Sequence, residues 1–95
     1  MCESHAGVQA QACAALRSLA LNDANSVKVA ALGGIEAILK AMGTHTHNAD
    51  VQKAACTALL SLTASNDANK VKVAAIGGVQ AILDSGCSVA DVVAL

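Results

Sequence analysis

Two histidines at alternate positions, His45 and His47, could begin a metal site in this 95-residue sequence. A zinc site would need two further ligands at suitable spacing, and Cys2 and His5 near the N-terminus are the available candidates. No second cluster has zinc-ligand spacing, and the two histidines stand in a polar stretch, Gly43-Thr44-His45-Thr46-His47-Asn48. We therefore expect a solvated loop here and no metal site.

The sequence contains nucleophilic residues, but no complete catalytic set. Covalent catalysis requires a nucleophile, a base and an orienting group that converge in space. Cys13 and Cys56 lie within apolar helical pattern, and Ser18 and Ser61 have no base on an adjoining helical turn. We therefore expect no enzymatic activity and no cofactor. We expect Cys13 and Cys56 to be small buried residues in a reducing compartment.

Two glycine pairs, Gly33-Gly34 and Gly77-Gly78, each precede an apolar segment. A phosphate-binding loop would need further glycines after a strand and usually a following lysine, and no strand precedes either pair. The pairs instead predict turns between helices. The first glycine of each pair suits a left-handed residue after a helix, and the second allows a sharp turn into the next helix.

The composition excludes several classes of function. The chain carries a net charge of −1 and has no aromatic residue, so it has neither a basic surface for nucleic acid nor a ring to stack on a base. No apolar run reaches the ~20 residues that a membrane span requires. The N-terminus lacks the features of a signal peptide. We therefore expect a cytoplasmic protein that binds no nucleic acid and does not insert into membranes.

An internal duplication organises the sequence. Residues 22–39 (NDANSVKVAALGGIEAIL) and 66–83 (NDANKVKVAAIGGVQAIL) are identical at fourteen of eighteen positions. Upstream, residues 8–21 and 51–64 are identical at eight of fourteen positions. The two copies are offset by 43 or 44 residues, a period typical of stacked helical repeats.

The spacing of apolar residues predicts a single all-α domain over residues 1–95. We expect a long helix at 8–21, a complete repeat at 24–64, a partial repeat at 68–86 and an irregular tail at 87–95. The complete repeat contains a short helix (24–32), a middle helix (35–42) and a long helix (51–64). The second copy contains a short helix that ends at 76 and a middle helix at 79–84.

The same pattern predicts helix caps and inward-facing residues. Asp23 is expected to cap the short helix, and Asn48 or Asp50 the long one. The residues expected to face the core are Val8, Ala12, Ala15, Leu16 and Leu19 in the first helix, Val27, Ala30 and Ala31 in the short helix, and Ile35, Ile38, Leu39 and Met42 in the middle helix.

Over residues 8–86 the sequence resembles the armadillo repeat family. The matching features are the short helices that end in a glycine pair, the GGIEAIL and GGVQAIL middle helices, and the VQ-x-x-AC-x-AL-x-SL long helices. The resemblance implies a right-handed superhelical stack of repeats. It also implies a non-catalytic module for protein–protein interaction, such as a scaffold.

Armadillo arrays as a family bind extended peptides along the surface formed by successive long helices. The resemblance implies that this surface comprises Ala14, Arg17 and Ser18 from the first long helix and Lys53, Thr57, Leu60 and Ser61 from the second. The importin-alpha branch lines this groove with Trp and Asn, and Ala14, Ser18, Thr57 and Ser61 stand at the matching positions here. A basic nuclear-localisation peptide is therefore not expected, and Arg17 and Lys53 favour an acidic or neutral segment.

Neither end of the predicted stack is polar, and the helix at 79–84 lacks the long helix that would cover it. Armadillo-like repeats pack mainly on their neighbours, and three or more are usually needed for stability. We therefore expect either a part of a longer array or a chain that completes its core by self-association through the exposed repeat ends. This structural role is the alternative to partner binding.

Overall fold

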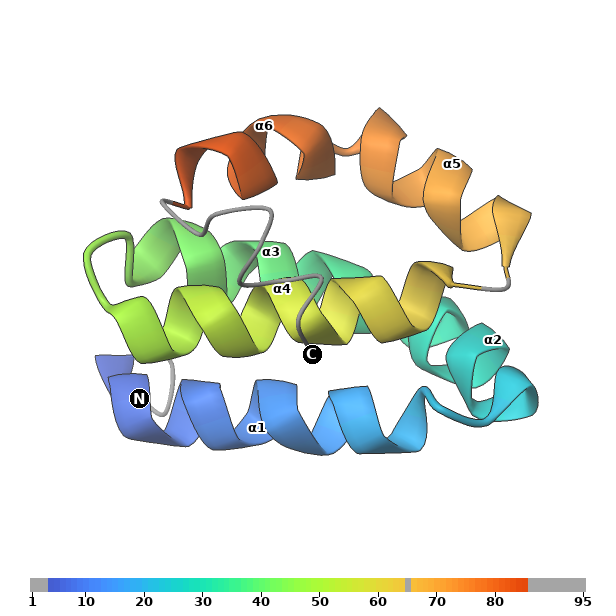
Figure 1. Cartoon of the computed structure of the whole chain (residues 1–95), viewed down its shortest axis with the longest axis horizontal. Coiled ribbons are helices and arrows are strands. Elements are labelled where there is room, and N and C mark those ends of the chain that lie inside the picture. Colours follow the sequence, from blue (N-terminus) through green and yellow to red (C-terminus); the bar gives the residue numbers. More distant parts are fainter. Residues whose placement is uncertain (1–3, 65, 86–95) are drawn as a thin grey trace.

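The computed structural model describes residues 4–64 and 66–85, and the helices there confirm the prediction of an all-α chain. The described residues form α1 (Ala6–Leu19), α2 (Asp23–Ala31), α3 (Gly34–Thr44), α4 (Ala49–Thr63), α5 (Asp67–Ala75) and α6 (Gly78–Asp84) (Figure 1). The predicted helix bounds agree with these to within two residues. The predicted irregular tail at 87–95 lies outside the described residues.

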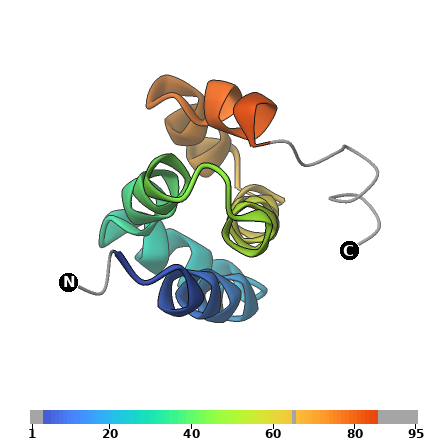
Figure 2. The same ribbon diagram turned by 90° about the vertical axis from the view of Figure 1, so that its left-hand side faces the viewer.

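The helices are stacked in three layers. The two long helices, α1 and α4, lie side by side and run in the same direction, and α3 packs against α4 (Figures 1 and 2). The α5–α6 pair covers α3 and α4 on the side opposite to α1. Within the described part of the chain, α1 and the α5–α6 pair therefore form the two ends of the stack.

Asparagine side chains cap three of these helices. The side-chain oxygens of Asn22, Asn48 and Asn66 each accept a hydrogen bond, 2.9 to 3.1 Å long, from the backbone N–H three residues later. The prediction that Asp23 caps α2 is wrong, and so is the alternative that Asp50 caps α4. Both aspartates stand in the first helical turn, where a negative charge still favours the helix dipole.

The glycine pairs form the turns as predicted. The second glycine of each pair, however, is needed for close helix packing and not for the sharp turn that was expected. Gly33 and Gly77 have left-handed φ angles of 88° and 93°. Gly34 has an ordinary φ, yet a Cβ atom there would lie 2.8 Å from the carbonyl oxygen of Val29. Gly34, like Gly78 in the second copy, therefore allows the close approach of two helices.

The hydrophobic core is centred on α4, where Val51, Ala55, Ala58, Leu59 and Leu62 are almost fully buried. They meet Ile35, Ile38 and Met42 of α3, which the sequence correctly placed inside, and Leu39 is half-buried beside them. Cys13 and Cys56 are buried free thiols, which confirms the prediction of their burial. Ala30 of α2 also joins the core.

The apolar face predicted for the first helix is mostly exposed, which corrects the sequence-based expectation. Val8 and Leu19 are 48% and 51% exposed, and Ala12 and Ala15 are also exposed, while Leu16 is half-buried. Their equivalents on α4, 43 residues later, are all buried. The difference has a physical cause, because α2 and α3 pack on this face of α4 and no described helix covers it on α1.

The short helix requires a similar correction. Val27 is 56% exposed and Ala31 is exposed, although both were expected to face the core. Ser26, a polar residue, is buried in their place, and its hydroxyl donates a 2.7 Å hydrogen bond to the Ala20 carbonyl. This bond satisfies the hydroxyl and anchors α2 to the end of α1.

Two buried amides hold the layers in register. The Gln52 amide donates hydrogen bonds of 2.9 Å to the carbonyls of Met42 and His45, which joins α4 to the end of α3. The Asn69 amide donates to the carbonyls of Leu62 (2.8 Å) and Ser26 (3.3 Å), which joins α5 to α4 and α2. Among the described residues, no buried side-chain nitrogen or oxygen lacks a partner.

The unequal burial of equivalent leucines leads to a stability prediction. Leu62 is 0% exposed and Leu19 is 51% exposed. We expect Leu62→Ala to lower the free energy of unfolding by about 2–5 kcal/mol, because it removes buried methyl groups and leaves a cavity. Leu19→Ala should cost less than about 1 kcal/mol. Urea unfolding followed by circular dichroism at low protein concentration measures both, and equal losses would contradict the burial pattern.

Candidate functional site

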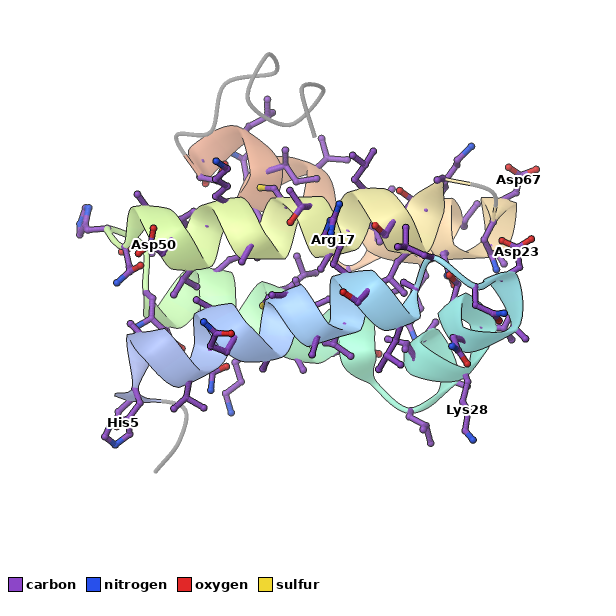
Figure 3. All side chains as sticks on the ribbon, turned by 60° about the horizontal axis from the view of Figure 1, so that its bottom comes forward. His5, Arg17, Asp23, Lys28, Asp50 and Asp67 are labelled. Carbon is purple, nitrogen blue, oxygen red and sulfur yellow. The ribbon has the colours of Figure 1, made fainter. Side chains whose placement is uncertain are left out.

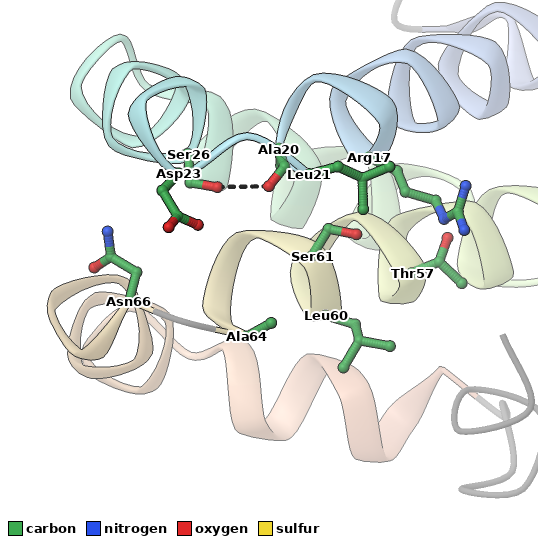
Figure 4. Close-up of a pocket in the computed structure, with 10 residues that line it drawn as sticks. All are labelled: Arg17, Ala20, Leu21, Asp23, Ser26, Thr57, Leu60, Ser61, Ala64 and Asn66. Carbon is green, nitrogen blue, oxygen red and sulfur yellow. Dashed lines mark hydrogen bonds between the residues drawn. The ribbon is translucent and has the colours of Figure 1, made fainter.

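A groove of about 250 Å³ lies between the C-terminal halves of α1 and α4 (Figure 4). It arises because the two helices lie parallel and each continues, at its C-terminal end, into a polar turn on the same side of the molecule. Its lining residues come from α1, α2, α4 and the turns that follow α1 and α4: Arg17, Ala20, Leu21, Asp23, Ser26, Thr57, Leu60, Ser61, Ala64 and Asn66.

Most of the predicted partner-binding residues meet in this region. Arg17, Thr57, Leu60 and Ser61 line the groove. Lys53 lines an adjoining hollow that also includes Arg17 and Thr57. The two remaining predicted residues, Ala14 and Ser18, are exposed on α1 but line neither of these hollows.

The charges in this region are more mixed than the sequence indicated. Arg17 and Thr57 stand at one end of the groove, whereas Asp23 and Asn66 stand at the other (Figure 4). Asp50 lines the adjoining hollow with Lys53 and Arg17, so a carboxylate accompanies the two cations there. Figure 3 shows Arg17 near the middle of the long helices, with the Asp23 side chain towards their C-terminal ends.

Sequence reasoning missed Asp23 and Asn66 because it assigned the turns to capping alone. Since Asn22 provides the cap of α2, the Asp23 carboxylate is available to the groove. The signal that could have identified these residues is the Asn-Asp pair that follows both long helices, at 22–23 and 66–67. Parallel long helices bring the two turns to the same end of the groove.

Two polar side chains of the groove are hydrogen-bonded to backbone carbonyls, and the walls are partly apolar. The Thr57 hydroxyl donates a 2.9 Å hydrogen bond to the Ala54 carbonyl, and Ser26 is fixed on Ala20. Leu21 and Leu60 are exposed apolar side chains in the wall. Among residues 4–64 and 66–85, no histidine or cysteine lines the groove. The groove thus combines partly apolar walls with a cation at one end and a carboxylate at the other.

The cysteines and histidines that the structure describes lie outside the groove. Burial raises the pKa of the Cys13 thiol above its ordinary value of 9.0, which reduces the thiolate fraction that a nucleophile needs. The Cys56 thiol donates to the Ser85 hydroxyl at 3.7 Å. The His45 backbone contributes to the turn after α3, where its N–H donates to the Ala41 carbonyl. Cys2 lies outside the described residues.

Two further findings concern the described residues alone. They contain no group of three or more His, Cys, Asp or Glu residues placed to hold a metal ion. They also contain no helix with the length and apolar character needed to traverse a bilayer.

Comparisons of the chain with protein-family models, with curated proteins and with solved structures found no match.

The shifted pKa of Cys13 leads to a prediction for the pH dependence of stability. Because the folded state holds the thiol proton more tightly than the unfolded state, the thiol's contribution is fully present below about pH 9. It is lost as the pH rises above that value. We expect the free energy of unfolding to fall more between pH 7 and pH 9.5 in the wild type than in Cys13→Ala. Urea unfolding at both pH values tests this, and identical changes would contradict it.

Proposed function

We propose that this chain is a non-catalytic protein–protein interaction module of the armadillo-repeat type. It binds an extended segment of a partner protein along α1 and α4. The observation that supports this most directly is that Arg17, Thr57, Leu60 and Ser61, from two successive long helices, line one groove. These four are among the seven residues that the resemblance to the armadillo family predicts for the partner-binding surface.

The pattern of helices supports the armadillo-like arrangement within this proposal. Helix α5 (Asp67–Ala75) begins and ends 44 residues after α2 (Asp23–Ala31), and α6 begins 44 residues after α3. The asparagine cap and the left-handed glycine recur at the same places in both copies. Equivalent helices that stack in parallel, as α1 and α4 do, would generate the superhelical array that the proposal requires.

The groove also indicates how a segment would be oriented. Exposed ion pairs contribute only about 0–1 kcal/mol each, so the affinity would come mainly from apolar contact with Leu21 and Leu60. The charges would instead fix direction. An acidic or neutral portion would lie near Arg17 and Lys53, and a hydrogen-bond donor would lie near Asp23.

A cytoplasmic location fits this proposal, because two of the four cysteines are buried free thiols. Free thiols persist in a reducing compartment, whereas disulfides are common in secreted domains of this size. Within the cell, the chain would act as a scaffold element that presents its groove to a partner.

A charge-reversal experiment tests the groove. A library of labelled extended peptides, each with a central leucine and one flanking acidic residue, is screened for binding by fluorescence polarisation. For any peptide that binds, Arg17→Glu combined with Lys53→Glu should weaken binding by roughly tenfold or more, because attraction is replaced by repulsion. The label on the peptide supplies the signal, since the chain has no Trp or Tyr.

Lys40→Glu provides the control, because Lys40 is exposed on α3 and does not line the groove. It should leave the peptide affinity unchanged. The proposal fails if the double variant binds the peptide as well as the wild type does while both remain helical. It also fails if Lys40→Glu weakens binding equally.

A further inference from the structure

The two ends of the stack both carry exposed apolar surface. At one end lie Val8, Ala12, Ala15 and Leu19 of α1, continuous with a hollow of about 550 Å³ formed by α1, α2 and α3. At the other end lies a hollow of about 250 Å³ among α4, α5 and α6. Here Val79 is 57% exposed, although its equivalent in the first copy, Ile35, is 0% exposed. We refer to these as the α1 end and the α6 end.

The duplication shows what fits into the hollow at the α6 end. Its lining residues are Cys56, Leu59, Leu60, Thr63, Lys70, Val73, Ala74, Val79 and Ile82. Their equivalents, 43 or 44 residues earlier, are Cys13, Leu16, Arg17, Ala20, Ser26, Val29, Ala30, Ile35 and Ile38. All of these except Arg17 and Ser26 belong to the core or pack against it, and the helix that packs on them is α4.

The α1 end has the complementary shape, because α1 corresponds to α4. Four exposed residues of α1 are equivalent to four residues of α4 that are buried against α2 and α3. The pairs are Val8 and Val51, Ala12 and Ala55, Ala15 and Ala58, and Leu19 and Leu62. Within the described residues, the α6 end therefore offers a short helix and a middle helix without a long helix. The α1 end offers a long helix without the other two.

We propose that copies of this chain associate head to tail, with α1 of one copy docked in the hollow among α4, α5 and α6 of another. The junction between two molecules would reproduce the packing of α4 against α1, α2 and α3 within one molecule. The partner is thus a second copy of the same chain. This inference depends on the duplication and on the observed packing of α4, and it does not depend on peptide binding in the groove.

Polar residues at the two ends match in the same way. Within one molecule, Lys72 of α5 donates a hydrogen bond to the Ala30 carbonyl at 3.1 Å and forms an ion pair with Glu36 at 3.2 Å. The pKa of Glu36 is lowered by its backbone hydrogen bond and by Lys72. Lys28 occupies the position of Lys72 in the first copy, and it is exposed at the α1 end (Figure 3).

In the junction, Lys28 would take the role of Lys72. The equivalents of Ala30 and Glu36 are Ala74 and Gln80, whose carbonyl and side-chain amide oxygens can accept its hydrogen bonds. Likewise Asn25, which lines the hollow at the α1 end, would take the role of Asn69 in joining two layers. The junction would therefore satisfy polar groups as well as bury apolar ones.

Because the two surfaces differ, the association would be heterologous and open-ended, and this property allows a decisive test. Leu19→Asp places a charge on the α1 end, and Val79→Asp places one on the α6 end. Both residues are exposed in the isolated molecule, so neither change should prevent folding. Light scattering over a concentration series, with refractive-index detection, should show association of the wild type and a monomer for each variant.

An equimolar mixture of Leu19→Asp and Val79→Asp should then form a dimer and stop there, because each variant retains one intact and complementary end. Leu21→Asp, a change of the same kind within the groove rather than at an end, should associate like the wild type. A mixture that remains monomeric would overturn the proposal, and so would a single variant that still associates. A wild-type chain that is helical and monomeric at every concentration would also overturn it.

Lys28 provides a second measurement. Lys28→Met should raise the dissociation constant of the junction by about two- to tenfold, since it removes hydrogen bonds but retains the aliphatic stem. Lys40→Met, on an exposed part of α3, should leave that constant unchanged. An unchanged constant for Lys28→Met would exclude the proposed pairing across the junction.

Discussion

The burial of one face of α4 against α2 and α3 is the interaction on which the rest of the structure depends. Val51, Ala55, Ala58 and Leu62 on this face are all 0% exposed, and α1 packs along another side of the same helix. The chain has no aromatic residue, so no single side chain contributes a large buried area. Alanine compensates by allowing close approach of helices, and stability is spread over many small contacts. A helix with neighbours on several sides is the natural centre of such a fold.

Close packing of small residues gives little directional specificity, and buried polar groups supply it. Gln52 fixes the start of α4 to the end of α3, and Asn69 fixes α5 to the end of α4. Each amide donates to two carbonyl groups of neighbouring elements, so each side chain joins separate helices. Because these bonds set the register of α4 against its neighbours, they also determine where Thr57, Leu60 and Ser61 lie in the groove.

The helices could be predicted from the sequence because their signals are local. Apolar periodicity, asparagine-rich turns and glycine pairs act within a few residues, so the bounds agree with the structure. Burial depends on neighbours, and periodicity cannot supply them. Val8 and Val51 have the same type and the same place in the pattern, yet they are 48% and 0% exposed. The site was predictable only where local signals determine it. The positions of Arg17 and Ser61 follow from helix periodicity. Asp23 lines the groove because Asn22, and not Asp23, caps α2.

The two proposals are physically connected through the parallel arrangement of the long helices. The groove exists because α1 and α4 lie side by side and continue into similar turns at the same end. In a head-to-tail junction, α4 of one molecule would lie beside α1 of the next in that same arrangement, so a new groove would form at the junction.

An extended partner that spans both grooves would bind the assembled state more tightly, because its second contact becomes intramolecular. Partner binding would then favour assembly, and assembly would favour longer partners. The small, weakly charged lining of each single groove suits this role, since affinity would accumulate over several junctions instead of residing in one site.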